Sequence, residues 1–308
     1  MPMTAMRAIF FGGKSYCDGF RLIGFAANSD GDSSLLRLTD NDAHGYGDVH
    51  KELLECKARC CSHTLQLFCA VADARLNIVF EDERLLVLNK PAGLVCHPTK
   101  GDEYSSLVGR VRIHLGPEYH LINRLDRETS GLVLIAKQDT AARALRRAWE
   151  SRTVRKVYNA IVHGHIATEG GRIAEPLGRD LNSHVAIKDC VRADGLAAET
   201  TFRVVERFER DGKPFSYLEV EPHSGRKHQI RIHLAHLGHP IVGDKIYGGD
   251  EMLYIDFIAD RLTDAQREKL ILPHHALHAQ RLEFPLHKEQ LAFEAPTEEW
   301  FANFLPRF

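Results

Sequence analysis

The stretch LINRLDRETSGLVLIAK, residues 121–137, places a charged turn directly before an apolar run. Residues 132–136 (LVLIA) are typical of a buried β-strand. Asp126 therefore lies on a tight turn supported by a core strand, between Arg124 and Arg127. We expect these two arginines to keep its carboxylate ionised, because nearby cations favour the charged form. Taken alone, an Arg-x-Asp-Arg pattern more often marks a solvated surface turn.

The size and composition of the chain predict a folded protein with one large domain or two. It has 308 residues, of which 44% are hydrophobic, enough for a sizeable core. No apolar run approaches the ~18 residues needed to span a membrane. The apolar stretch at residues 8–11 is too short for the core of a signal peptide. A soluble, cytoplasmic protein is the simplest expectation.

The charge distribution is more informative than the net charge of −2, which neither indicates nor excludes a nucleic-acid partner. One segment concentrates basic side chains that only Glu150 opposes along the sequence: Arg143, Arg146, Arg147, Arg152, Arg155 and Lys156. Phosphate contacts require such a local positive face. A solvated helix face gives the same pattern.

Cysteine and histidine patterns do not favour a metal site. The seven cysteines are odd in number and irregularly spaced, which predicts reduced thiols rather than a disulfide framework. Four of them crowd around His63, but no Cys-x-x-Cys pair is present, so free cysteines are favoured over a zinc site: Cys56, Cys60, Cys61 and Cys69. His274, His275 and His278 lack carboxylate or cysteine partners in register and are interpreted as surface or core histidines.

The remaining pattern predicts alternating strands and helices. Strands are expected at residues 78–80 and 85–88, followed by the shaped turn Lys-Pro-Ala-Gly at residues 90–93. A helix is expected at residues 140–150, followed by a strand at 154–162 with Lys156 and Tyr158 on the same side. Two further strands are expected around the Asp211-Gly212 turn, from residues 199–208 and 215–221. Ile230, Leu234 and Leu237 recur at helical spacing, and Gly238 is placed to end that helix.

In this order, the blocks resemble the RluA family of pseudouridine synthases. The family motif H-R-L-D-x-x-T-S-G-L-L-L-x-A-K corresponds to residues 123–137, with Asn123 in place of His. The pattern K-x-Y-x-A-x-V-x-G corresponds to residues 156–164. The motif T-G-R-x-H-Q-I-R-x-H-L…G-H-P-I-x-G-D corresponds to residues 224–244, with Ser224 in place of Thr.

The resemblance implies roles for individual residues. Asp126 would be the catalytic aspartate, Arg231 its cationic partner, and Tyr158 the residue that lies against the target base. Arg124 would fill the space that the extruded uridine vacates. Three further basic residues are expected to bind the substrate: Arg226 and Lys227 at the start of the second block's helix, and Arg147 in the basic segment. An Asp beside an Arg fits attack on the sugar and attack on the base equally well.

The implied architecture is α+β, a mostly antiparallel mixed β-sheet with flanking helices and RNA in a cleft across one face. We expect the catalytic domain at residues 76–308. Residues 1–75 form a poorly defined N-terminal segment, either a divergent accessory domain or a largely irregular extension. The family reaction requires neither cofactor nor metal, so we expect none, and we expect a monomer whose partner is RNA.

The predicted function is the isomerisation of uridine to pseudouridine in structured RNA. Large-subunit ribosomal RNA is the first choice of substrate and transfer RNA is the alternative. A noncatalytic RNA-binding protein on the same fold would lack a reason to keep Asp126, Tyr158 and Arg231 together. A phosphatase or dehalogenase would carry its nucleophile after a strand, commonly with a second Asp two residues on, where this chain has Glu128.

Overall fold

The computed structural model describes residues 23–27, 33–37, 76–98 and 105–306. The chain divides into two compact units, Met1–Ala72 and Asp73–Phe308. In the first unit, strands β1 (Ile23–Ala27) and β2 (Ser33–Arg37) pair antiparallel. The crowded cysteines between residues 56 and 69 lie outside the described residues. Within the described ranges, no helix is long and apolar enough to cross a membrane.

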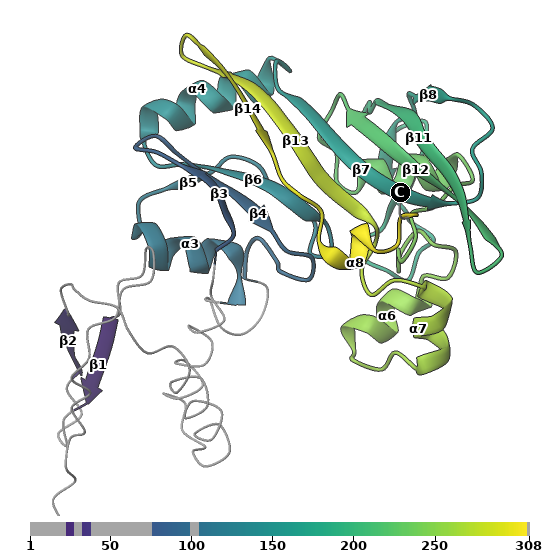
Figure 1. Cartoon of the computed structure of the whole chain (residues 1–308), viewed down its shortest axis with the longest axis horizontal. Coiled ribbons are helices and arrows are strands. Elements are labelled where there is room, and N and C mark those ends of the chain that lie inside the picture. Colours follow the sequence, from purple (N-terminus) through teal and green to yellow (C-terminus); the bar gives the residue numbers. More distant parts are fainter. Residues whose placement is uncertain (1–22, 28–32, 38–75, 99–104, 307–308) are drawn as a thin grey trace, which may run out of the picture. The chain divides into compact units, whose positions relative to one another are not determined.

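A long mixed sheet organises the second unit (Figure 1). Its pairings are antiparallel except for the one between β6 and β13, which confirms the predicted mostly antiparallel α+β architecture. The strands follow the order β3 (Ile78–Glu81), β4 (Leu85–Lys90), β6 (Ser130–Ala136), β13 (Leu277–Leu286), β7 (Arg155–His163), β12 (Lys213–Pro222), β11 (Thr200–Arg210) and β8 (Gly170–Ile173), with β5 (His120–Leu121) on β6 and β14 (Glu289–Glu294) on β13.

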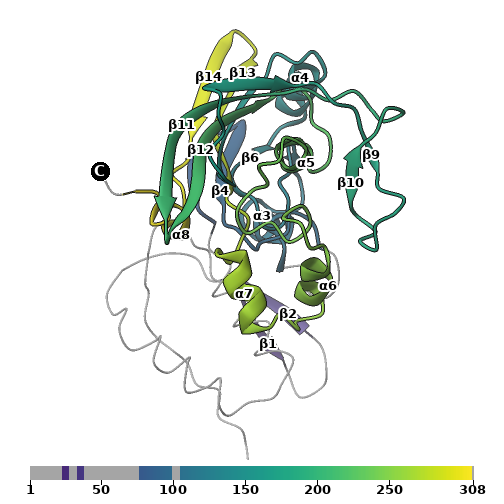
Figure 2. The same cartoon turned by 90° about the vertical axis from the view of Figure 1, so that its right-hand side faces the viewer.

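Helices cover both faces of the β4–β6 part of this sheet (Figure 1). Side chains alternate along β6: Leu132 and Leu134 pack in the cluster with α4, whereas Val133 and Ile135 pack in the cluster with α3. All seven residues of β6 are buried, as the apolar run predicted. Figure 2 shows the small sheet of β9 and β10 beyond α5, apart from the main sheet. The elements outside the main sheet are α3 (Leu107–Leu115), α4 (Asp139–Glu150), α5 (Gln229–His236), α6 (Met252–Ile258), α7 (Asp264–Leu270), α8 (Glu299–Ala302), β9 (Leu177–Arg179) and β10 (Asp189–Val191).

The predicted hairpin and the predicted second-block helix are both confirmed. β11 and β12 pair through Arg210 and Lys213 around the Asp211-Gly212 turn, where both turn residues have positive φ (52° and 69°). Helix α5 ends at His236, and Gly238 follows with φ of 89°, the left-handed conformation that commonly terminates helices.

The parallel contact between β6 and β13 lies directly after the turn that carries Asp126. It pairs Ser130 with His278 and Gly131 with Ala279. Gly131 has φ of +110°, and a Cβ there would lie 2.6 Å from the backbone nitrogen of Ala279. Only glycine allows this approach, because an added methyl group would overlap main-chain atoms that cannot turn aside.

We therefore expect Gly131→Ala to lower the free energy of unfolding by on the order of 3 kcal/mol or more, measured by urea denaturation. Gly212→Ala is the matched control, since Gly212 also has positive φ but nothing lies within 4 Å of its added Cβ. In this control the added methyl group meets no other atom, so the loss measures only the cost of a positive φ in a non-glycine residue, about 1 kcal/mol. Equal losses in the two variants would show that the approach of β13 does not require glycine at position 131.

Candidate active site

Asp126 lies on a turn that a buried lysine ties to the end of β4. The Lys90 Nζ donates hydrogen bonds to the carbonyl oxygens of Pro91 (2.8 Å), Leu94 (2.8 Å) and Arg127 (3.1 Å). The amide of Gly93 also donates to the Arg127 carbonyl oxygen (2.9 Å). Burial lowers the pKa of Lys90 to about 8, so the amine is poised between its charged and neutral forms at mildly alkaline pH. These bonds fix the backbone on which the Asp126 side chain is mounted.

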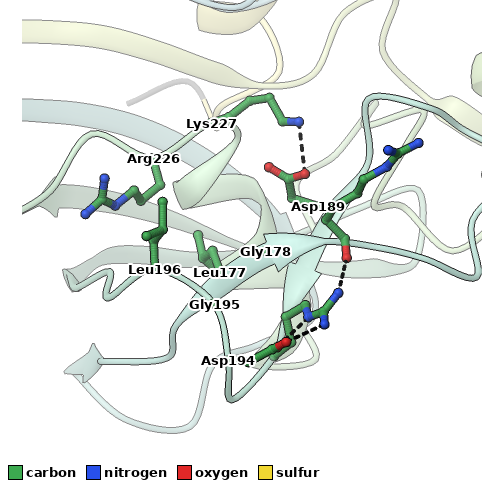
Figure 3. A pocket seen from close by; sticks show the side chains of 10 residues that line it. Leu177, Gly178, Asp189, Asp194, Gly195, Leu196, Arg226 and Lys227 are labelled. Carbon is green, nitrogen blue, oxygen red and sulfur yellow. Dashed lines mark hydrogen bonds and ion pairs between the residues drawn. The ribbon is translucent and has the colours of Figure 1, made fainter.

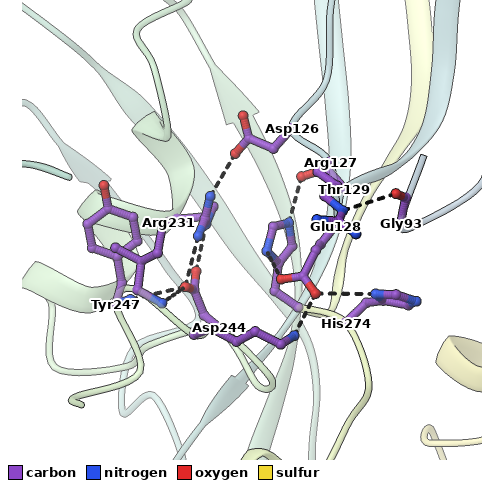
Figure 4. A network of polar contacts seen from close by, with 12 residues as sticks. Gly93, Asp126, Arg127, Glu128, Thr129, Arg231, Asp244, Tyr247 and His274 are labelled. Carbon is purple, nitrogen blue, oxygen red and sulfur yellow. Dashed lines mark hydrogen bonds and ion pairs between the residues drawn. The ribbon is translucent and has the colours of Figure 1, made fainter. Parts of the chain in front are cut away.

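Arg231 bridges two carboxylates that are far apart in the sequence (Figure 4). Its Nε and Nη2 donate to Asp244 Oδ2 (2.6 Å) and Oδ1 (2.9 Å), and its Nη1 donates to Asp126 Oδ2 (2.8 Å). The Asp244 and Arg231 side chains are 0% and 5% exposed, whereas that of Asp126 is 30% exposed. The guanidinium is therefore anchored from beneath by Asp244, and only Asp126 is open to an incoming molecule.

The electrostatics keep Asp126 ionised. Burial is the largest single effect on the pKa of Asp126 and raises it, but Arg231, followed by His228 and His275, together outweigh burial, and the net pKa lies below its ordinary value. The expectation that Arg124 and Arg127 would do this is wrong. Both are exposed, and the Arg127 guanidinium stacks over the Phe257 ring at 5.1 Å. A cation held in place by burial acts more strongly than two solvated ones, because water screens the latter.

His228, directly before α5, forms another wall of the site. It has φ of 55°, and its Nε2 lies 3.7 Å from Asp126 Oδ2. Its Nδ1 is 2.9 Å from the hydroxyl of Tyr247, whose ring lies 5.1 Å from the Arg231 Cζ. Burial, followed by the charge of Arg231, lowers the pKa of His228 to about 4. At neutral pH His228 is therefore uncharged, and Arg231 is the cation in direct contact with Asp126.

Tyr158 lies on β7, as the strand pattern predicted. It is half-buried and packs against two of the core clusters, one of which includes Val133 and Ile135. Burial and the negative charge of Asp126 both raise the pKa of Tyr158, so it stays protonated. Its ring therefore borders the carboxylate as a neutral, planar surface.

A second buried ion pair supports the far side of the acidic turn (Figure 4). Glu128 pairs with Lys245, and its Oε1 also lies 3.3 Å from His274 Nδ1. Lys245 Nζ donates further to the Pro273 carbonyl oxygen (2.8 Å). Burial pushes the pKa of Glu128 upward, but the hydrogen bond with His274 and the charge of Lys245 outweigh it. Asp126 and Glu128 are thus both held as carboxylates in one short turn.

The histidines near residue 275 serve this turn. His275 Nε2 lies 2.7 Å from Thr129 Oγ1, and His278 Nδ1 lies 2.9 Å from Ser130 Oγ. Burial, followed by the charge of Arg231, lowers the pKa of His275 to about 4. Within the described residues, no group of three or more His, Cys, Asp or Glu side chains is placed to hold a metal ion.

The predicted substrate-binding residues lie outside this cluster. Arg124 is exposed on the acidic turn, and Arg147 is exposed on α4. Arg226 and Lys227 immediately precede His228; the first donates to the Ala197 carbonyl oxygen (3.2 Å) and the second pairs with Asp189 (2.9 Å). Their roles in binding stay predictions.

The basic segment needs one correction. Arg155 is not free for phosphate, because it forms ion pairs with Glu221 and with Glu283 (3.4 Å) on neighbouring strands. Sequence distance hid these partners, since both glutamates reach Arg155 only through strand pairing. Arg155 is itself exposed, and the other exposed members of the segment are Arg143, Arg146, Arg147 and Arg152.

Several residues of the site were not singled out from the sequence. Asp244 and His228 lie within the quoted motif blocks and Tyr247 lies three residues beyond, but nothing in their spacing identified their partners. Glu128 and Lys245 gave no local signal, because charged residues on turns are normally solvated. Their ion pair spans 117 residues of sequence.

The comparisons with known proteins assign this fold to a class of RNA-modifying enzymes. The profile of the RNA pseudouridylate synthase family matches residues 84–236. The ribosomal large subunit pseudouridine synthase D of Pseudomonas aeruginosa is 37% identical over 239 residues, covering 74% of this chain and 70% of the relative. The dual-specificity RNA pseudouridine synthase RluA of Vibrio parahaemolyticus is 34% identical over 237 residues, covering 76% and 84%.

A solved structure gives the same result. Human RNA pseudouridylate synthase domain containing 1 superposes with a TM-score of 0.59 at 28% identity, covering 73% of this chain and 84% of that protein. The chain belongs to the RNA pseudouridylate synthase family.

Because Arg231 holds Asp126 ionised, we expect Arg231→Lys to make activity more sensitive to acid. A lysine keeps the charge but cannot bond both carboxylates, so the pKa of Asp126 rises and less of it is ionised at pH 5. We expect the single-turnover rate to fall about 100-fold at pH 8 and further at pH 5, measured as tritium release from RNA labelled at carbon 5 of uridine.

Arg203→Lys is the control for that variant, because Arg203 forms an exposed pair with Glu219 (3.3 Å) on β11 and β12. A pH profile of Arg231→Lys that runs parallel to the wild-type profile would contradict the assignment of Arg231 as the group that sets the charge of Asp126.

Proposed function

We propose that this protein converts specific uridines of large-subunit ribosomal RNA to pseudouridine, with Asp126 as its catalytic carboxylate. The observation that carries the proposal is the 2.8 Å bond between Arg231 Nη1 and Asp126 Oδ2. It holds an ionised acid, 30% exposed, on a rigid turn. This arrangement is suited to charge stabilisation or nucleophilic attack at a bound molecule.

The reaction breaks the bond between the ribose and N1 of uracil, turns the base, and joins the ribose to C5. N1 gains a proton and C5 loses one, so no electrons or groups enter from outside. The protein must supply an anion beside the sugar–base bond and a surface on which the base can turn. Asp126 supplies the first, and the neutral ring of Tyr158 supplies the second.

The uridine must leave its stack to reach Asp126, which costs a few kcal/mol. Arg124 is exposed two residues before Asp126, where its side chain can enter the space in the RNA that the extruded uridine leaves. The relative from Pseudomonas aeruginosa is named a ribosomal large subunit pseudouridine synthase, which supports large-subunit ribosomal RNA as the substrate. The dual-specificity relative supports transfer RNA as the second candidate.

A noncatalytic role in RNA binding is less consistent with the site. Keeping Asp126 ionised beside buried groups costs solvation free energy, and a carboxylate repels phosphates. Binding alone would be served better by a neutral side chain at that position. We further propose that the protein acts in the cytoplasm as a monomer, without a cofactor.

One experiment tests both the proposed RNA substrate and the proposed role of Asp126: the gene is deleted and pseudouridines are mapped in total RNA. We expect specific positions in large-subunit ribosomal RNA to revert to uridine, wild-type protein to restore them, and Asp126→Asn not to restore them. Asp126→Asn should retain its thermal unfolding temperature within a few degrees. Losses confined to transfer RNA would favour the second candidate, and restoration by Asp126→Asn would remove the proposed role of Asp126.

The exposed basic face of α4 provides a separate test of RNA binding. Replacing Arg146, Arg147 and Arg152 together with glutamine should weaken binding to large-subunit ribosomal RNA and reduce its salt dependence, by up to about 0.9 in log–log slope per lost phosphate contact. The matched control is Arg155→Gln, because that side chain is already paired with Glu221 and Glu283. An unchanged slope in the triple variant would identify these residues as a solvated helix face.

A further inference from the structure

A second depression opens beside the start of α5, between that helix and the small sheet of β9 and β10 (Figure 3). Its volume is about 390 Å³, and none of its lining residues belongs to the Asp126–Arg231–Asp244 cluster. It has two parts, an apolar floor and a basic rim. The steps of the reaction use neither part, although two residues of the rim, Arg226 and Lys227, are predicted to bind the substrate.

The floor contains two glycines, Gly178 and Gly195, that lie too close to neighbouring atoms to be replaced by larger residues. Leu177 and Leu196 exchange two main-chain hydrogen bonds (2.9 and 2.8 Å), which hold the two segments together. A Cβ on Gly195 would lie 2.5 Å from the Leu177 backbone, and a Cβ on Gly178 would lie 2.9 Å from Arg192 Cδ. Leu196 itself is 62% exposed, although the backbone beneath it is fixed. Leu196, on this fixed backbone beside glycines, offers an exposed apolar surface, which is called the platform below.

The rim carries more positive than negative charge. Two carboxylates are already neutralised locally: Asp194 by Arg192 (2.6 Å) and Asp189 by Lys227 (2.9 Å). Among the described residues, no carboxylate pairs with the guanidinium of Arg179 or of Arg226. Both are exposed at the edge of the platform. A ligand with one flat apolar face and one negative charge is complementary to such a surface, and a nucleotide has this form.

The depression connects physically with the active site. Tyr247 accepts a hydrogen bond through its hydroxyl from the backbone N–H of Asp189 (3.3 Å) on β10. The same hydroxyl lies 2.9 Å from His228 Nδ1, and His228 faces Asp126. Lys227 of the rim is adjacent to His228 in the chain. The depression is therefore linked to Asp126 through Tyr247 and His228, which brings it within reach of a nucleotide near the one at Asp126.

A third feature extends the basic surface beyond this depression. Arg226 also lines a smaller depression of about 170 Å³, together with Arg152, Lys156 and His223 near the end of α4. Arg226 is therefore shared between the two depressions. Together they form a basic path from the exposed face of α4 to the β9–β10 sheet, which fits an extended polyanion better than a single small anion.

We propose that this depression is a second nucleotide-binding subsite, which takes a nucleotide of the substrate RNA near the target uridine. Its base rests on the Leu196 platform and its phosphate contacts Arg179 and Arg226. The inference rests on the proposed action on RNA and adds a subsite that holds the strand at a second point. Two points of attachment fix the register of the strand at Asp126, whereas one would allow it to slide.

The test is filter binding of large-subunit ribosomal RNA, isolated from a strain lacking the gene, to full-length variants. Arg179→Gln should raise Kd about fivefold and lower the log–log salt slope by about 0.7, as expected for one lost contact to single-stranded RNA. Leu196→Asn should raise Kd about tenfold without changing the salt slope, because it removes apolar contact and no charge. Leu196→Phe should keep or tighten binding, since it enlarges the platform.

The controls separate this inference from the proposed function. Arg203→Gln removes an exposed arginine on β11 and should leave Kd unchanged, and thermal unfolding of each variant reports its folding. If Leu196→Asn and Arg179→Gln bind with wild-type Kd and salt slope, the subsite is overturned, whether or not the wild-type protein releases tritium. Tight binding of free uridine monophosphate that Leu196→Asn abolishes would also overturn it, by assigning the depression to a free nucleotide. Absence of tritium release by the wild-type protein with intact RNA binding would instead count against the proposed reaction.

Discussion

The bridge from Asp244 through Arg231 to Asp126 is the constraint on which the site depends. Removing these charges from water costs several kcal/mol per ion, and only well-formed hydrogen bonds offset that cost. Asp244 provides them by accepting from two guanidinium nitrogens and from the backbone N–H groups of Ile246 and Tyr247. One guanidinium nitrogen remains directed at Asp126. The buried carboxylate thus orients the cation, and the cation determines the charge of the accessible acid.

The turn around Asp126 is held from several directions by groups that are far apart in the sequence. Lys90 secures its backbone, and Lys245 secures Glu128 two residues beyond the acid. His275 reaches Thr129 from the segment before β13. Each contact removes freedom from the turn, so the carboxylate position is fixed before any RNA arrives. Such preorganisation lowers the reorganisation that the reaction would otherwise require.

The sequence predicted what is local and periodic. The buried β6 followed from an apolar run, α4 and α5 from helical spacing, and the β11–β12 hairpin from an Asp-Gly turn flanked by strand patterns. The pairing of Asp126 with Arg231 came from family resemblance, because no periodicity links positions separated by 105 residues. The ion-pair partners of Glu128 and Arg155 could not be predicted from the sequence. These partners are distant along the chain, and only the folded arrangement of turns and strands brings them together. The expectation that Arg124 and Arg127 keep Asp126 ionised failed for the same reason. Residues that are adjacent in the sequence need not bring their charges together in the folded chain.

The parallel pairing of β6 with β13 has a consequence for how the protein is made. The acidic turn is completed by contacts from His275, His278 and Ala279, which the ribosome synthesises almost 150 residues after the turn. Contacts of such long range form late, because closing a long loop is entropically unfavourable. A nascent chain that has emerged only as far as α4 lacks these contacts, so its carboxylate turn is still unsupported. The turn that carries Asp126 can therefore gain these supports only after nearly all of the second unit has been synthesised.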